Sequence, residues 1–308
     1  MKRDIAKNVP ASVRQRLLDI ARDTGRPFGE LFRYYAMERF LYRLSISPAG
    51  RKFVLKGALM LVAWKAPVSR PTMDIDLLAR MENRIEDIAS AIRMACSRSV
   101  EPEDGLFFDK DSISGERIAE DADYEGVRIR LQGNLGNARI ALRIDVGFGD
   151  VVTPRPVLIH YPVILEMPAP HLLGYTRESV IAEKFHAMVK LGILNSRMRD
   201  YFDVWLLSRQ FAFDGNHLAL AIRKTFARRR TIVPSLPTAL SDSFSGDPLK
   251  ITQWKAFLRK NRLPMAPAEL REVVRDLSAF LGPIAEALSA KEMFQGTWRP
   301  PGPWAGRT

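Results

Sequence analysis

The segment Asp74-Ile75-Asp76-Leu77-Leu78 decides the fold of this chain, because its acidic and apolar residues alternate. A period of two is typical of a β-strand, in which residues two apart point to the same face. The strand therefore places the carboxylates of Asp74 and Asp76 on one face, while Ile75 and Leu77 can enter a core on the other. Two carboxylates this close repel each other, so a site that keeps both ionised needs positive charge nearby.

Divalent cations are one source of that positive charge. Mg²⁺ binds one or two carboxylates together with substrate phosphates, and two such ions about 3.5–4 Å apart can clamp an in-line phosphoryl transfer. The motif Asp-x-Asp is common by itself, and two solvated acids at an exposed strand end are the alternative. The residues around the motif favour the metal site.

A candidate phosphate-binding turn precedes the acidic strand. The strand-like run Phe53–Leu55 ends at Lys56 and Gly57, where a helical pattern begins. A glycine at such a turn lets backbone N–H groups approach a phosphate, and Lys56 adds a positive charge. Just before the acids, Arg70 could hold a phosphate, and the Thr72 hydroxyl could contact phosphate or metal-bound water. An ordinary turn and a solvated loop are the alternatives.

A third acid lies on a later predicted strand. Between residues 106 and 149 the alternation of apolar and polar residues, with turn residues at 133–136, predicts a hairpin in a mixed sheet. If the strand of Asp145 lies beside that of Asp74, three carboxylates converge as metal ligands. Asp145 could then also help to deprotonate an attacking hydroxyl. Pairing with an arginine such as Arg143 is the alternative role for Asp145.

Composition sets limits on the partners. The chain has 308 residues, of which 46% are hydrophobic, and its 47 Lys and Arg against 35 Asp and Glu give a formal net charge of +12. Such a charge favours nucleic acid as a partner, and a basic surface that only aids solubility is the alternative. No apolar run is long enough to span a bilayer, and no signal-peptide core is present at the N-terminus, so we expect a cytoplasmic protein without membrane contact.

Helical periodicity dominates both ends of the chain. Residues 10–45 have helical patterns, and after a proline-rich stretch at 154–170 the sequence is again mostly helical. We predict an α+β protein of two domains: residues 1–165, with a mixed sheet and flanking helices, and residues 166–308, which form a helical domain. The segment 298–308 is expected to be irregular.

A second polar constellation lies in the helical half. Lys184 is at the edge of the apolar stripe of a helix that Thr176 caps, and it can either snorkel to solvent or reach a triphosphate. Asp200 and Asp203 are three residues apart on the next predicted helix and share a face. Asp200 could position Lys184 or the nucleotide, or only stabilise the helix N-terminus, and Asp203 is interpreted as mainly structural.

Together these motifs resemble the AbiEii/AbiGii toxin family, whose members have the nucleotidyltransferase fold of the DNA polymerase β-like superfamily. The resemblance rests on two blocks in the expected order: Leu55–Leu59 with Arg70–Leu77, and Glu178–Met188 with Arg197–Trp205. The chain departs from the wider superfamily at one point, because Ala58 follows Gly57 where a serine or a second glycine is usual.

The resemblance implies a type IV toxin that transfers a nucleoside monophosphate from a nucleoside triphosphate (NTP) to transfer RNA, by metal-dependent in-line attack, and a cognate AbiEi-like antitoxin. The implied metal ligands, for Mg²⁺ or Mn²⁺, are Asp74, Asp76 and Asp145. The implied catalytic residues are Asp74, Asp76, Asp145, Lys184 and Asp200, and the implied nucleotide-binding residues are Lys56, Gly57, Arg70, Thr72 and Lys184. Transfer to a protein hydroxyl and a non-catalytic nucleic-acid-binding regulator are the alternatives.

Overall fold

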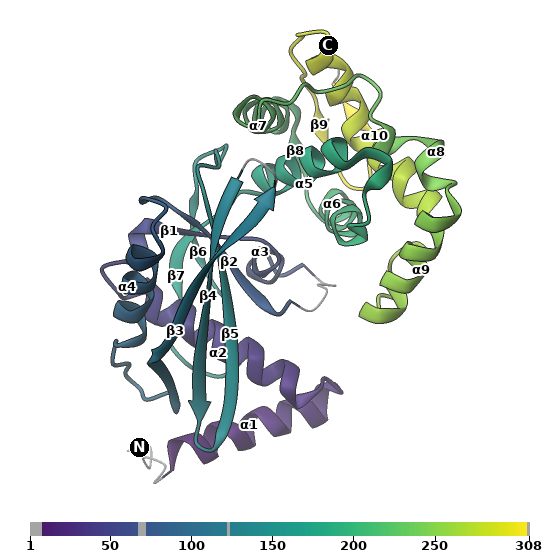
Figure 1. The fold of residues 1–308 in the computed structure, drawn as a ribbon. Helices are drawn as coiled ribbons and strands as arrows, with labels where there is room; N and C mark the ends of the chain where they lie inside the picture. The colour runs from purple at the N-terminus through teal and green to yellow at the C-terminus, as the bar shows by residue number, and fades with distance from the viewer. Residues whose placement is uncertain (1–7, 67–71, 122–123, 307–308) are drawn as a thin grey trace. The chain divides into compact units, whose positions relative to one another are not determined.

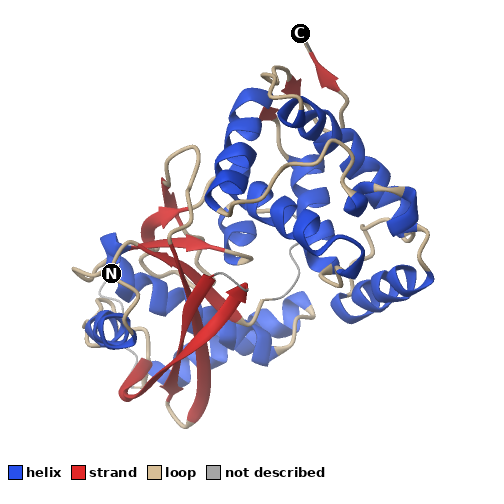
Figure 2. Ribbon diagram, turned by 45° about the horizontal axis from the view of Figure 1, so that its top comes forward, coloured by secondary structure: helices blue, strands red, loops and turns tan. Residues whose placement is uncertain are grey.

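The computed structural model describes residues 8–66, 72–121 and 124–306. The chain divides into two compact units: the first comprises Met1–Lys65, Pro71–Gly149 and Val157–Gly174, and the second comprises Ala66–Arg70, Asp150–Pro156 and Tyr175–Thr308. The first unit combines a sheet with helices, and the second is mostly helical (Figure 1 and Figure 2). The predicted α+β class is therefore confirmed, while the domain boundary between residues 165 and 166 stays a prediction.

Within the described residues, the first unit contains a seven-stranded sheet. Its strands are β1 (Phe53–Lys56), β2 (Asp74–Ala79), β3 (Leu106–Asp121), β4 (Tyr124–Leu135), β5 (Ala138–Phe148), β6 (Val157–His160) and β7 (His171–Gly174). Its helices are α1 (Val9–Thr24), α2 (Phe28–Ser45), the 3-10 turn η1 (Gly50–Lys52), α3 (Leu59–Ala63) and α4 (Ile85–Cys96). Helices α2 and α4 pack against the sheet.

The sheet has the strand order β3-β4-β5-β2-β1-β7-β6 and mixes parallel with antiparallel pairs. Strand β2 runs parallel to β5 and antiparallel to β1. Ile75 and Leu77 of β2 are fully buried beside Ile144 and Val146 of β5. Burial of this apolar face fixes the register, because a slip of one residue would turn every side chain to the other face.

For the first unit, one local expectation needs correction, and two short strands were not predicted. The hairpin between β4 and β5 turns at residues 136–137, whereas the sequence pattern predicted residues 133–136; Gly133 still pairs with Ile140. In addition, β6 and β7 lie in and just after the proline-rich stretch and extend the sheet beyond β1. Each has only four residues, which is too short to show a recognisable period.

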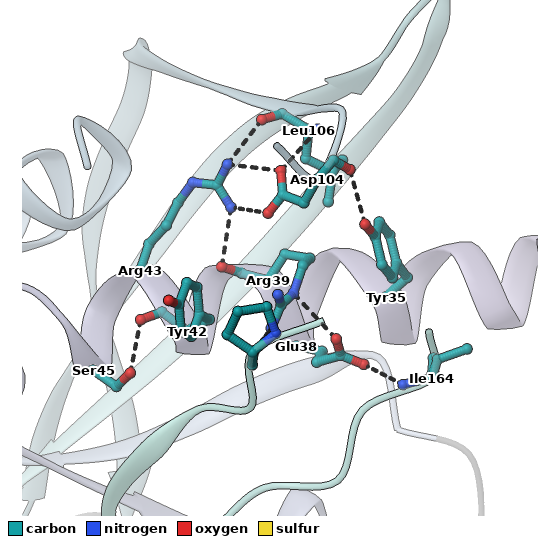
Figure 3. Close-up of polar contacts among 10 residues, drawn as sticks. Tyr35, Glu38, Arg39, Tyr42, Arg43, Ser45, Asp104, Leu106 and Ile164 are labelled. Carbon is teal, nitrogen blue, oxygen red and sulfur yellow. Dashed lines mark hydrogen bonds and ion pairs between the residues drawn. The ribbon is translucent and has the colours of Figure 1, made fainter. Parts of the chain in front are cut away.

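Buried charged side chains tie α2 to loops of the first unit (Figure 3). Arg43 donates from Nη1 and Nη2 to the two carboxylate oxygens of Asp104, at 2.5 and 2.9 Å. Glu38 pairs with Arg39 at 3.1 Å and accepts a 2.8 Å hydrogen bond from the backbone N–H of Ile164. These pairs explain how a helix buried on nearly all sides can carry charged residues, since each buried charge has a partner of opposite sign.

The second unit is built from helices and a small sheet. Its helices are α5 (Arg177–Leu191), η2 (Gly192–Leu194), α6 (Met198–Gln210), α7 (Gly215–Arg228), η3 (Thr238–Leu240), α8 (Asp242–Ser245), α9 (Pro248–Asn261) and α10 (Leu270–Ser289). Its strands are β8 (Phe213–Asp214), β9 (Thr297–Trp298) and β10 (Trp304–Ala305). None of the helices in the described residues has the length and apolar character needed to cross a membrane.

The C-terminal segment is irregular as expected, apart from the two-residue strands β9 and β10, but tryptophan packing holds it in place. Trp298 and Trp304 are buried, and both rings contact Phe280 of α10. Their indole N–H groups donate to the carbonyls of Ser208 and Phe280, at 2.7 and 2.9 Å. The prolines and glycines of this segment are turn signals and permit sharp turns. The strands between those turns have only two residues each, which is too short for a recognisable period.

Candidate active site

Asp74 and Asp76 lie on β2 as predicted. Their side chains are half-buried, while Ile75 between them is fully buried, so both carboxylates lie on the face opposite the apolar core. Asp76 is the middle of a row across three strands, since its neighbours in register are Lys56 on β1 and Asp145 on β5. Side chains of residues paired in this way point to the same face, so the third acid predicted from sequence joins the first two.

Two arginines pair with acids of this row. Arg128 on β4 donates from Nε and Nη2 to the two oxygens of Asp145, each at 2.8 Å, and these hydrogen bonds raise the pKa of the guanidinium. Arg143 on β5 forms an ion pair with Asp74. The sequence alternative had placed Arg143 on Asp145, but Arg143 lies opposite Asp74 in the parallel register of β2 and β5. Arg128 was not singled out from sequence, although alternation already placed it on the polar face of its strand.

Gly57 leaves the space that the carboxylate of Asp76 fills. Its φ is +71°, a conformation that side-chain-bearing residues rarely adopt. A Cβ atom at this position would lie 1.9 Å from Oδ2 of Asp76. The following helix α3 has only five residues, so its dipole is short. An anion would instead be bound by the backbone N–H groups of this turn, which it can approach closely.

Thr72 is buried just before β2, and its polar groups serve the backbone. Its N–H donates to the hydroxyl of Tyr34 on α2 at 3.0 Å, and its own hydroxyl donates to the carbonyl of Asp74 at 3.4 Å. These contacts hold the start of the acidic strand. Arg70, the other predicted phosphate-binding residue of this segment, lies outside the described residues.

Lys184 and Asp200 form a second group, in the second unit. Thr176 caps α5 by accepting a hydrogen bond from the N–H of Ser179, as the sequence predicted. The ammonium of Lys184 on α5 lies 2.7 Å from Oδ1 of Asp200 and 2.9 Å from Oδ2 of Asp203, both on α6. The sequence had assigned only Asp200 to Lys184, but the fully buried Asp203 also pairs with its ammonium. The spacing of three residues on one helix was the signal that could have shown this.

The face that carries Asp74, Asp76 and Asp145 is where a divalent cation would bind in the first unit. Within the described residues, no group of three or more His, Cys, Asp or Glu side chains is arranged to hold a metal ion, and arginines occupy Asp74 and Asp145. The donor set nevertheless fits Mg²⁺ or Mn²⁺, because three carboxylates share one face and a glycine makes room for one of them. The residues that would hold the ion are Asp74, Asp76 and Asp145.

Comparison with known proteins identifies the family. The model of the family "Nucleotidyl transferase AbiEii toxin, Type IV TA system" matches residues 39–277. Among solved structures, JHP933 from Helicobacter pylori has 15% identity and a TM-score of 0.48, and the match covers 85% of this chain and 93% of that chain. A candidate nucleotidyltransferase from H. pylori has 16% identity and a TM-score of 0.44, with 82% and 92% covered. No curated protein matches the chain.

The family match spans well over half of the chain and includes both polar groups described above. The predicted recognition is therefore confirmed: the chain belongs to the AbiEii nucleotidyl transferase toxin family of type IV toxin–antitoxin systems.

Proposed function

We propose that this protein transfers a nucleoside monophosphate from an NTP to an RNA acceptor, transfer RNA in particular, in a metal-dependent reaction that releases pyrophosphate. Membership of the family supports nucleotidyl transfer as the activity and an antitoxin as a partner. The observation that carries the finer proposal is the row Lys56–Asp76–Asp145 on adjacent strands, with Asp74 on the same face. A binding module has no need to gather three carboxylates in this way.

In the proposed reaction, the acceptor hydroxyl oxygen forms a bond to the α-phosphorus, and the bond from that phosphorus to the bridging oxygen of pyrophosphate breaks. Asp74, Asp76 and Asp145 would hold the divalent cation, which when bound supplies positive charge against the phosphate oxygens. Asp145 accepts the proton that leaves the attacking hydroxyl.

The remaining predicted residues bind the nucleotide. Lys56, Arg70 and the backbone at Gly57 would contact the triphosphate, because cations and exposed N–H groups are the usual phosphate ligands. Thr72 would contribute through its hydroxyl, whose contact with the Asp74 carbonyl is long, at 3.4 Å. Lys184 is assigned to the negative charge that develops on the leaving pyrophosphate. Asp200 orients its ammonium through the 2.7 Å contact.

The partner and location follow from the same proposal. An AbiEi-like antitoxin is proposed as the cognate partner, since type IV systems pair each toxin with an antitoxin. The cytoplasm is proposed as the place of action, because NTP and RNA are both available there.

A transfer assay tests the proposal. Wild type, Asp76→Asn and the control Asp23→Asn, an exposed acid on α1, are each incubated with one α-³²P-labelled NTP, Mg²⁺ and total cellular RNA. We expect label on an RNA band with wild type and Asp23→Asn, and none with Asp76→Asn. Label on protein instead would favour transfer to a protein hydroxyl. Absence of label with folded wild type and all four NTPs would favour a non-catalytic regulator.

A further inference from the structure

The two arginines on the acid-bearing face have a direct geometric relation to the proposed metal ligands. Arg128 is the register neighbour of Asp145 and occupies both of its oxygens with hydrogen bonds of 2.8 Å. Arg143 is the register neighbour of Asp74 and donates to its Oδ2. Neither arginine has a metal-binding role in the proposed reaction, yet each contacts an oxygen that a metal ion would use.

The charges of these side chains offset those of the acids. Lys56, Arg128 and Arg143 bring three positive charges to the face that carries the three carboxylates, so repulsion between the acids is relieved without a divalent cation. An incoming ion of charge +2 is repelled by the guanidinium groups and would bind the same carboxylate oxygens. The ion and the two arginines therefore compete for the carboxylate oxygens of Asp74 and Asp145.

We propose that Arg128 and Arg143 compete with the divalent cation: they hold Asp145 and Asp74 while no ion is bound, and they give way when one binds. The inference rests on the proposed metal-dependent function. Without an ion, the two ion pairs would keep the three carboxylates close together, so that the site is already assembled when the ion and the nucleotide bind.

The structure provides room for the arginines to move. The side chain of Arg143 is 44% exposed and that of Arg128 is 25% exposed, so neither is locked in a core. Arg128 also lies opposite Glu116 of β3, with 4.0 Å between Nη1 and Oε1. This carboxylate offers Arg128 another partner when Asp145 is taken by an ion.

Mn²⁺ binding tests the proposal without an activity assay. The full chain, free of nucleotide, is titrated with Mn²⁺, and free Mn²⁺ is measured by electron paramagnetic resonance. The test variants are Arg128→Gln and Arg143→Gln. Arg139→Gln is the matched control, because Arg139 is an exposed arginine on the same strand and the same face as Arg143, four residues away. Arg143→Lys keeps the charge, and Asp76→Asn identifies the site.

We expect Arg128→Gln and Arg143→Gln to bind Mn²⁺ about fivefold or more tightly than wild type, since a competing cation is removed. Arg139→Gln and Arg143→Lys should bind close to the wild-type affinity, and Asp76→Asn should lose the site. In EDTA, circular dichroism should show lower melting temperatures for the two test variants, which Mn²⁺ restores.

Two results would overturn the inference, and they differ in what they say about function. If wild type binds Mn²⁺ through Asp76 but the two glutamine variants bind no more tightly, competition is wrong while metal use stands. If neither wild type nor the glutamine variants bind Mn²⁺ at a site that depends on Asp76, both the competition and the proposed metal dependence fail.

Discussion

Gly57 and Asp76 share a space that exists only because residue 57 has no side chain. The Cβ of any other residue would overlap Oδ2 of Asp76, and the φ of +71° would add backbone strain. The position of the Asp76 carboxylate therefore depends on Gly57, which lies in the turn between β1 and α3 rather than on β2.

Replacement of Gly57 by alanine tests this dependence. We expect Gly57→Ala to lose about 100-fold in transfer rate, because it displaces the Asp76 carboxylate from its place in the site. Gly25→Ala is the matched control: Gly25 also has positive φ, at +68°, but has no atom within 4 Å of an added Cβ. Both variants should lose about 1–2 kcal/mol of stability from backbone strain, so equal activities of the two would contradict the assigned role.

Lys184 is expected to matter for stability as well as for reaction. Its ammonium faces Asp200 and Asp203, which are buried, so Lys184→Met leaves two carboxylates close together without this cation. We expect a loss of about 3–5 kcal/mol in the free energy of unfolding, measured with urea at neutral pH. The double variant Lys184→Met/Asp203→Asn should recover part of the loss. A single variant as stable as wild type would show that the cluster does not depend on this lysine.

Helix α2 presents two adjacent tyrosines with different tasks. The hydroxyl of Tyr34 accepts the N–H of Thr72, next to the acidic strand, whereas the hydroxyl of Tyr35 donates to the carbonyl of Asp104 in the core, at 2.8 Å. At the scale of elements, α2 thus both supports the sheet and holds the residues that lead into β2.

Removal of each hydroxyl separates these tasks. Tyr34→Phe should lower the transfer rate several-fold with little change in the KM for NTP, because Thr72 loses a backbone anchor worth about 1 kcal/mol. Tyr35→Phe should lower the melting temperature and keep the wild-type rate. Urea unfolding and steady-state kinetics of both variants check this, and a rate loss in Tyr35→Phe alone would reverse the assignment.

The same helix should confer a pH dependence on stability. Burial raises the pKa of Glu38 from 4.5 to about 7, although Arg39 and the N–H of Ile164 favour the ionised form. The folded protein therefore keeps a proton that the unfolded chain loses. The stability from this group is complete below about pH 4.5 and is lost as the pH rises through 7, a change of about 3 kcal/mol.

Glu38→Gln removes this titration. The fall in unfolding free energy between about pH 4.5 and 8 should be smaller in Glu38→Gln than in wild type, as measured by urea unfolding at several pH values. Glu30→Gln, on the first turn of the same helix, is the control and should retain the wild-type profile. Identical profiles for wild type and Glu38→Gln would show that another group causes the dependence.

The net charge of +12 belongs to the whole molecule rather than to one site. If RNA is the acceptor, cationic side chains neutralise its phosphates and release counterions, so affinity should fall at least about tenfold from about 50 to about 200 mM salt. Fluorescence anisotropy with labelled transfer RNA measures this. Asp76→Asn should show the same salt dependence, because it leaves the cations unchanged, and an affinity independent of salt would argue against phosphate contacts.

Local periodicity alone determined much of this protein. The alternation around Asp74 and Asp76 placed both acids on one face, and helical patterns located α1, α2, α4 and most helices of the second unit within a few residues. Such patterns arise between residues two to four positions apart, and they need no knowledge of distant partners. The motif blocks added the family, which the family match confirms.

Only the tertiary structure decided which distant residues meet. The parallel pairing of β2 with β5 places Asp76 beside Asp145, 69 residues later, and Arg143 beside Asp74. Asp145 then pairs with Arg128 of β4. No local pattern encodes that register, because it is selected by burying the apolar faces of both strands together. The two-residue strands of the C-terminal segment have the same origin, since tryptophan packing against α10 orders a segment whose own sequence favours turns.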